Sequence, residues 1–155
     1  MSLRDRINTF LAQKRIAMIG VSRNPRDFSR HLFHDMKARG YEMIPVNPNA
    51  GEIEGETCFA HVRDIPGGVN AALLMTSAAE SNRIVNECIE AGVERIWFYR
   101  AMGDGAVSRT AVEQCDTYGI EAIPGECPYM FMPDCGFPHN VHGWVHTRMS
   151  AKYRA

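Results

Sequence analysis

Apolar residues gather into five short runs that alternate along the chain with longer amphipathic stretches. Nearly every position in each run is apolar, which is typical of a strand in a parallel sheet that is buried on both faces. The predicted strands cover residues 15–21, 41–46, 70–76, 95–100 and 121–124. We therefore expect these five runs to form the centre of the protein.

Apolar residues at helical spacing predict helices between the strands and at the N-terminus. The predicted helices cover residues 3–13, 28–39, 78–91 and 106–118. Ser2 and Asp5 form a capping-box pattern at the start of the first helix, and a glycine follows each of the other three. The segment 49–66 is irregular, with a short extended piece expected around 57–60 and a helical turn near 62–65.

Strict alternation of strand and helix predicts an α/β fold. We expect a doubly wound, mostly parallel five-stranded Rossmann-like sheet with helices on both faces. Residues 1–127 are predicted to form this domain, with the helix in residues 1–14 packed on it, and residues 128–155 to form a C-terminal helical extension. Such sheets bind ligands beyond the carboxyl ends of their strands, at the switch in strand order. The residues directly after each strand are therefore the functional candidates.

Composition places the chain among ordinary globular proteins. Its 155 residues are 45% hydrophobic and 23% charged, which suits one domain with one sizeable core. No apolar run approaches the roughly 20 residues that span a membrane, and the N-terminus lacks a secretory pattern. Five cysteines form an odd set, which we read as reduced thiols. We therefore expect a cytoplasmic protein.

The net charge of −1 hides an uneven distribution. Residues 1–40 carry nine Lys or Arg against three Asp or Glu, and the chain has fourteen Arg but only three Lys. The planar guanidinium of arginine suits phosphate and carboxylate groups. The balance predicts neither a nucleic-acid nor a membrane partner, but it favours a small anionic ligand near the N-terminal third.

The loop after the first predicted strand has the chemistry of an anion site. Gly20 permits a close backbone approach, and the next helix N-terminus offers N–H groups and a positive dipole end. Ser22 adds a hydroxyl, while Arg23, Arg26 and Arg30 add positive charge. The candidate residues of this loop are Gly20, Val21, Ser22, Arg23, Asn24 and Arg26. We predict that they bind phosphate.

The second strand end argues against a nicotinamide dinucleotide. NAD-binding folds usually carry a GxGxxG loop and an Asp or Glu that bonds the ribose 2′-hydroxyl. This chain has only Gly20 before the helix, and Pro45-Val46-Asn47-Pro48 where the acid would stand. The two loops together predict a nucleotide with several phosphates and no contact to a 2′-hydroxyl.

Four segments of the chain resemble a known family. The segments IAMIGVSRNP, YEMIPVNPN, EIEGETCF and GECP are similar to those of the coenzyme A-binding domain family, which is itself similar to the N-terminal domain of the succinyl-CoA ligase alpha subunit. The resemblance covers roughly residues 16–127 and implies coenzyme A as the cofactor.

The resemblance also implies which residues contact the coenzyme. The pyrophosphate would lie on Gly20, Val21, Ser22 and Arg23, the adenosine on Val46, Asn47 and Pro48, the adenine or pantetheine arm near Met75, Thr76 and Ser77, and the rest of that arm near Phe98 and Tyr99. Many relatives have Phe-Arg-x-Pro where this chain has Met75-Thr76-Ser77-Ala78, so one positive charge is missing here.

These patterns favour a non-catalytic protein that binds coenzyme A or an acyl-CoA. A small NAD(P)-dependent oxidoreductase and an interaction protein with a decayed nucleotide site remain the alternatives. The cysteines and histidines of the tail lack the paired-cysteine knuckle of structural zinc sites, so we expect no metal there. The apolar residues of the same tail predict a helix that docks on the sheet edge or on a second copy of the chain, which makes a homodimer a candidate assembly.

Overall fold

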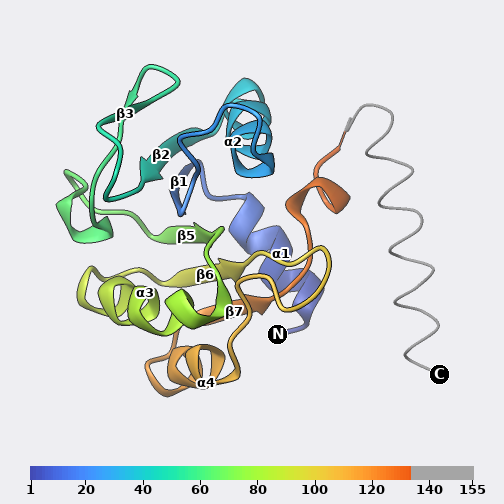
Figure 1. Ribbon diagram of the computed structural model, residues 1–155. Coiled ribbons are helices and arrows are strands. Elements are labelled where there is room, and N and C mark those ends of the chain that lie inside the picture. Colours follow the sequence, from blue (N-terminus) through green and yellow to red (C-terminus); the bar gives the residue numbers. More distant parts are fainter. Residues whose placement is uncertain (134–155) are drawn as a thin grey trace.

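Five parallel strands form the central sheet of the computed structural model, which describes residues 1–133 (Figure 1). The strands are β1 (Arg15–Ile19), β2 (Glu42–Val46), β5 (Ala71–Leu74), β6 (Arg95–Phe98) and β7 (Glu121–Pro124). They lie in the order β2-β1-β5-β6-β7, and every neighbouring pair is parallel. The order reverses direction between β1 and β5, as in other doubly wound sheets. The predicted fold class is confirmed.

Helices cover both faces of this sheet. The core on one face joins α1 (Leu3–Leu11) and α2 (Phe28–Ala38) to the strands. The core on the other face joins α3 (Ala78–Glu90) and α4 (Arg109–Thr117) to them, and the two pairs lie on opposite sides in Figure 1. No helix among residues 1–133 is long and apolar enough to cross a membrane.

The first helix is capped as its sequence predicts. The Ser2 hydroxyl accepts a hydrogen bond from the Asp5 N–H at 3.1 Å, and the Asp5 carboxylate accepts one from the Ser2 N–H at 3.0 Å. The fully buried ring of Phe10 packs edge-on against Trp97, with 5.3 Å between the ring centres. Phe10 therefore packs this helix against β6 of the sheet.

A short antiparallel hairpin follows the second strand. It consists of β3 (Glu52–Ile53) and β4 (Glu56–Thr57), and Phe59 then bridges in parallel to the last residue of β2. The extended structure therefore begins earlier than the piece expected around 57–60. The predicted helical turn is present as a 3₁₀ turn, η1 (Val62–Asp64).

The predicted helix over 106–118 starts too early in the sequence. The structure begins α4 at Arg109, because the Ser108 side chain caps the helix by accepting a hydrogen bond from the Ala111 N–H. The Ala106 N–H instead donates to the carbonyl of Tyr99 at 2.8 Å, which ties this part of the loop to the end of β6.

The described chain continues past the last strand with η2 (Pro128–Met130). Tyr129 and Met132 are each only 6% exposed and belong to the same core as α2. The domain boundary after residue 127 stays a prediction. The C-terminal helical extension is predicted over residues 128–155, and its residues 134–155 lie outside the described part of the chain. The predictions of a docked helix, of no metal in the tail and of a homodimer rest on these residues, so they stay predictions.

Candidate functional site

The carboxyl ends of β1 and β5 meet at the switch in strand order. Gly20 directly follows β1, and its N–H donates to the carbonyl of Val46 at 2.9 Å. Its φ is +90°, and a Cβ built there would lie 2.8 Å from Cγ2 of Thr76 and 3.2 Å from the Thr76 backbone nitrogen. Only glycine fits such a close crossing. This position therefore brings the first loop directly over the end of β5.

The loop after Gly20 is held in shape by its own polar side chains. The Ser22 hydroxyl accepts from the Asn24 N–H, and the Asn24 side-chain oxygen accepts from the Arg26 N–H, both at 3.0 Å. The Ser22 N–H donates to the hydroxyl of Ser29 on α2 at 2.9 Å. Arg23 and Arg26 stay exposed, so this loop presents two guanidinium groups to solvent.

The N-terminus of α2 is already capped by a carboxylate. Asp27 accepts hydrogen bonds from the Ser29 N–H at 2.9 Å and from its hydroxyl at 2.7 Å. The positive end of the helix is thus offset within the protein itself, which sequence reasoning did not foresee. Arg30 turns inward, with its guanidinium donating to the carbonyl of Arg23 at 3.1 Å and lying beside Glu54.

Asn47 ties the ends of β2 and β1 together. Its side-chain N–H donates to the carbonyl of Val21 at 2.9 Å, and its side-chain oxygen accepts from the Asn49 N–H at 2.8 Å. An amide side chain has two N–H donors and two lone pairs, so one of each remains for a ligand. Pro48 beside it is exposed. The segment therefore still offers both polar and apolar contacts.

A buried serine, which sequence reasoning missed, anchors the end of β5. Ser81 on α3 has no exposed surface, and its hydroxyl lies 3.2 Å from that of Thr76, 2.6 Å from the Ala106 carbonyl and 3.1 Å from the Ser77 carbonyl. Ser77 itself caps α3. A polar residue within the apolar stripe of the predicted helix is the signal that points to such a role.

Aromatic rings border the site beyond β6. Phe28 at the start of α2 lies over Tyr99, with 5.2 Å between the ring centres. Burial raises the pKa of the Tyr99 hydroxyl, and the neighbouring Cys127 thiol raises it further. The hydroxyl therefore loses its proton only at a higher pH than that of an ordinary tyrosine. Cys127 is itself only 3% exposed.

The structure brings the predicted residues to one edge of the sheet, with unequal access to solvent. Exposed side chains belong to Arg23, Asn24, Arg26, Pro48 and Ser77, and half-buried positions are Gly20, Ser22, Asn47, Met75, Thr76 and Tyr99. Val21, Val46 and Phe98 lie in the core with 0%, 2% and 0% of their surface exposed. Any contact from these last three to a ligand would therefore come from their backbone.

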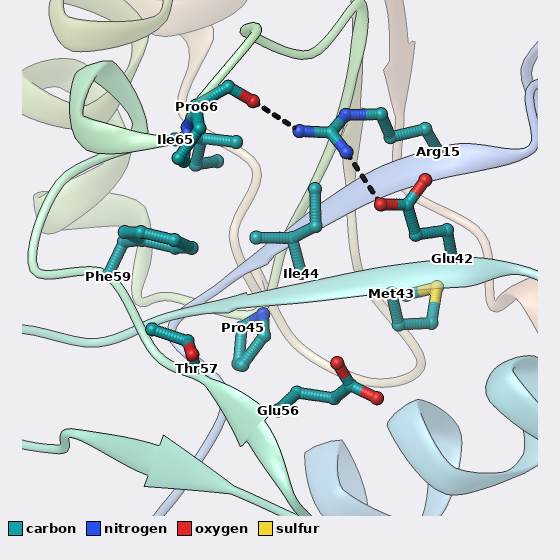
Figure 2. Close-up of a pocket in the computed structure, with 10 residues that line it drawn as sticks. All are labelled: Arg15, Glu42, Met43, Ile44, Pro45, Glu56, Thr57, Phe59, Ile65 and Pro66. Atoms are coloured by element: carbon teal, nitrogen blue, oxygen red, sulfur yellow. Dashed lines mark hydrogen bonds and ion pairs between the residues drawn. The ribbon is translucent and has the colours of Figure 1, made fainter.

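A separate pocket lies along the outer edge of β2 (Figure 2). Its volume is about 260 Å³, and Ile44, Phe59 and Ile65 line it, with the Arg15–Glu42 ion pair at its rim. None of the predicted site residues lines this pocket. Small-molecule sites usually measure roughly 300–1,000 Å³. The pocket is small for a nucleotide, so we place the candidate site at the carboxyl edge instead.

Comparison with known proteins identifies the family to which this fold belongs. Residues 14–133 match the family model described as a CoA binding domain. The chain belongs to this CoA binding domain family. The match includes the first loop, the β2 end, the hairpin and the β5 end, and membership supports a CoA-binding role.

Two curated proteins and one solved structure are similar to this chain. The alpha subunit of an ADP-forming acetate–CoA ligase (form II) from Pyrococcus furiosus is 27% identical over 129 residues, covering 78% of this chain and 28% of the subunit. YneT, an uncharacterized Bacillus subtilis protein, is 26% identical over 114 residues, covering 74% of this chain and 82% of YneT. A hypothetical protein from Pyrococcus horikoshii has a TM-score of 0.75 at 24% identity, covering 83% and 87%. The chain thus spans less than a third of the ligase subunit.

Proposed function

We propose that the protein binds coenzyme A or an acyl-CoA and catalyses no reaction itself. The phosphates lie on the loop after β1, and the adenosine lies along the segment 46–48. One observation carries this placement: Gly20 crosses over the end of β5 with a φ of +90°, beside two exposed arginines, at the switch point of the sheet. Ligands of doubly wound sheets bind at such a point.

The β2 end supports coenzyme A over a nicotinamide dinucleotide. The side chain at this position is the amide of Asn47, which bonds Val21 and Asn49, and no carboxylate stands there to accept a ribose 2′-hydroxyl. Coenzyme A has a phosphate on its ribose, so positive charge suits it better than a carboxylate would. The exposed side chains of Arg23 and Arg26 supply that charge.

The positions of the nucleophilic groups support a binding role without catalysis. Cys127 is buried beside Tyr99, and burial raises the pKa of the Tyr99 hydroxyl above that of an ordinary tyrosine, so this hydroxyl forms no phenolate base near neutral pH. His34 and His61 lie outside the β1 loop and pair with Glu54 at 3.0 Å and with Glu87 at 3.3 Å. None of these groups forms the nucleophile and base pair that covalent catalysis requires.

Thermal unfolding with four ligands tests the proposal. The melting temperature is measured with coenzyme A, dephospho-coenzyme A, NAD and ADP, each at the same concentration. A ligand present at 100 times its Kd stabilises a fold by about 2.7 kcal/mol, which for a chain of this size raises the melting temperature by about 5–10 °C. We expect the largest rise with coenzyme A. Selective stabilisation by NAD, or no stabilisation by any ligand, would contradict the proposal.

Removing the two exposed arginines tests where the ribose phosphate binds. In the double variant Arg23→Ala, Arg26→Ala, coenzyme A and dephospho-coenzyme A should raise the melting temperature equally, because the charge that distinguishes them is gone. Arg109→Ala is the matched control, since this exposed arginine lies on α4 and pairs with Glu113. An undiminished preference for coenzyme A in the double variant would refute this assignment.

A further inference from the structure

Glu54 lies in the turn of the hairpin after β2, at a position where the backbone conformation does not favour glutamate. Glu54 has a φ of 49° and Gly55 a φ of 79°, and both values are positive as in a type I′ turn. Asn or Asp is preferred before glycine in such a turn, because both tolerate a positive φ better than glutamate does. A longer carboxylate at this position therefore calls for an explanation outside the turn.

The Glu54 carboxylate faces the basic side of α2. Its Oε1 lies 3.0 Å from Nδ1 of His34, and its Oε2 lies 3.8 Å from Nε of Arg30. Lys37, one further turn along the helix, donates to the Glu54 carbonyl at 3.1 Å and pairs with Glu56 at 2.7 Å. The hairpin is thus docked on one face of α2 by opposite charges.

The pair between Arg30 and Glu54 is buried without a good hydrogen bond. The two side chains are 14% and 24% exposed, and Arg30 Nε and Glu54 Oε2 have no hydrogen-bond partner among residues 1–133. Burying charged groups in this way contributes little to stability, because the desolvation penalty is large. The contacts that Nη1, at the other end of the Arg30 guanidinium, makes with backbone carbonyls give a better explanation for this buried pair.

That end of the guanidinium contacts the backbone of the loop after β1. Arg30 Nη1 donates to the carbonyl of Arg23 at 3.1 Å and lies 3.5 Å from that of Ser22. In a trans peptide the C=O and the following N–H point in opposite directions, so the Arg23 N–H is turned away from Arg30. The neighbouring N–H groups of Ser22 and Asn24 are already bound by Ser29 and Ser22.

We propose that Glu54 is a positioning residue for the ligand's phosphate. Its carboxylate holds the guanidinium of Arg30, and Arg30 in turn fixes the two carbonyls so that the Arg23 N–H faces the phosphate. The hairpin thereby sets the shape of a loop that lies about thirty residues earlier in the chain. This inference rests on the proposed function, because it assigns a phosphate to that N–H.

Glu54→Asn tests the inference, because asparagine suits the turn while the charge is lost. Calorimetric titration with ADP and with coenzyme A should show affinity reduced about 3- to 10-fold, while adenosine, which has no phosphate, changes less than twofold. Glu56→Gln is the matched control: it removes the same charge from the same hairpin, but Glu56 contacts Lys37 and not Arg30. The control should bind all three ligands within twofold of the wild type.

Two further readouts separate a positioning role from a structural one. The amide signal of Arg23 in the ligand-free protein should shift in Glu54→Asn and not in Glu56→Gln. Combining Glu54→Asn with Arg30→Lys should weaken ADP binding no more than Arg30→Lys alone, because the two residues act in series. Unchanged ADP affinity or an unshifted Arg23 signal in Glu54→Asn would overturn the inference. A wild type that binds neither ADP nor coenzyme A would instead overturn the proposed function, and the amide signal would still decide whether Glu54 orients the loop.

Discussion

At the scale of single residues, Gly20 combines two separate constraints. Its φ is +90°, and a Cβ would lie 2.8 Å from the Thr76 side chain. Gly40 has a similar φ of +95° but no atom within 4 Å of its Cβ position. Substitutions at Gly20 and Gly40 therefore separate the loss of stability caused by backbone strain from the loss caused by crowding.

We predict that Gly20→Ala is more destabilising than Gly40→Ala. Strain alone should cost about 1–2 kcal/mol at each position, and crowding against the β5 end should add about 1–3 kcal/mol at Gly20. Urea unfolding followed by circular dichroism measures both variants. Equal losses of stability would show that the close approach to Thr76 is easily relieved.

Ser81 gives a second prediction at this scale. Replacing it with alanine leaves the buried Ala106 carbonyl without this hydrogen bond and the half-buried Thr76 hydroxyl without this partner, which should cost about 1–3 kcal/mol. Amide exchange should also become faster at Ala106, since the loop after β6 loses an anchor. Unchanged stability and exchange would mean that water replaces the serine hydroxyl.

Sequence reasoning proposes single site residues where their own chemistry is enough to suggest a role, and these assignments stay predictions. Gly20, Arg23 and Arg26 were predicted because a glycine and two arginines after a buried strand indicate an anion site in any such fold. The inward turn of Arg30 was not predictable, because its partner Glu54 lies 24 residues away and depends on how the hairpin docks. Long-range pairs of this kind follow only from the tertiary structure.

At the scale of elements, the apolar runs predicted all five strands of the sheet because each is buried on both faces. Boundaries were less predictable. The strand expected over 15–21 ends at Ile19, since Gly20 leaves the extended conformation. The helix expected from residue 106 begins three residues later, at Arg109, because Ser108 caps it. The spacing of apolar residues does not reveal the position of this cap.

The contact between α3 and α4 carries a pH dependence. Burial raises the pKa of the Cys115 thiol from 9.0 to about 12 and raises that of Cys88, also from 9.0. An acid whose pKa is higher in the folded state binds its proton more tightly there, so its stabilising effect is complete below about pH 9 and is lost as the pH rises toward 12. We predict that the free energy of unfolding falls with pH above 9.

The variant Cys115→Ala checks this assignment. Its free energy of unfolding, measured by urea at pH 7, 9.5 and 10.5, should fall less steeply with pH than that of the wild type, because one buried thiol no longer resists ionisation. All other groups, including Tyr41 with its pKa raised by burial, are common to both proteins, so their contributions cancel in the comparison. Identical slopes would assign the alkaline loss of stability to those groups.

At the scale of the whole molecule, basic and acidic residues are distributed unequally around the proposed site. The exposed Arg23 and Arg26 lie on the loop after β1, while the hairpin beside it carries Glu52, Glu54 and Glu56. Glu54 and Glu56 are engaged by α2, so they offset its basic face and leave the arginines of the loop to an external anion. Among the basic residues near the N-terminus, Arg30 and Lys37 thus pair with the hairpin, whereas Arg23 and Arg26 are proposed to bind the ligand.

The most direct test of the proposed site is a map of backbone amide signals during a titration with coenzyme A. The largest shifts should fall on residues 20–24, on Asn47 and Asn49, and on residues 75–77, which meet at the carboxyl edge of β1, β2 and β5. Residues 42–44 and Ile65, beside the separate pocket on β2, serve as the internal control and should shift little. Absence of shifts at saturating coenzyme A, or shifts centred on that pocket, would contradict the account.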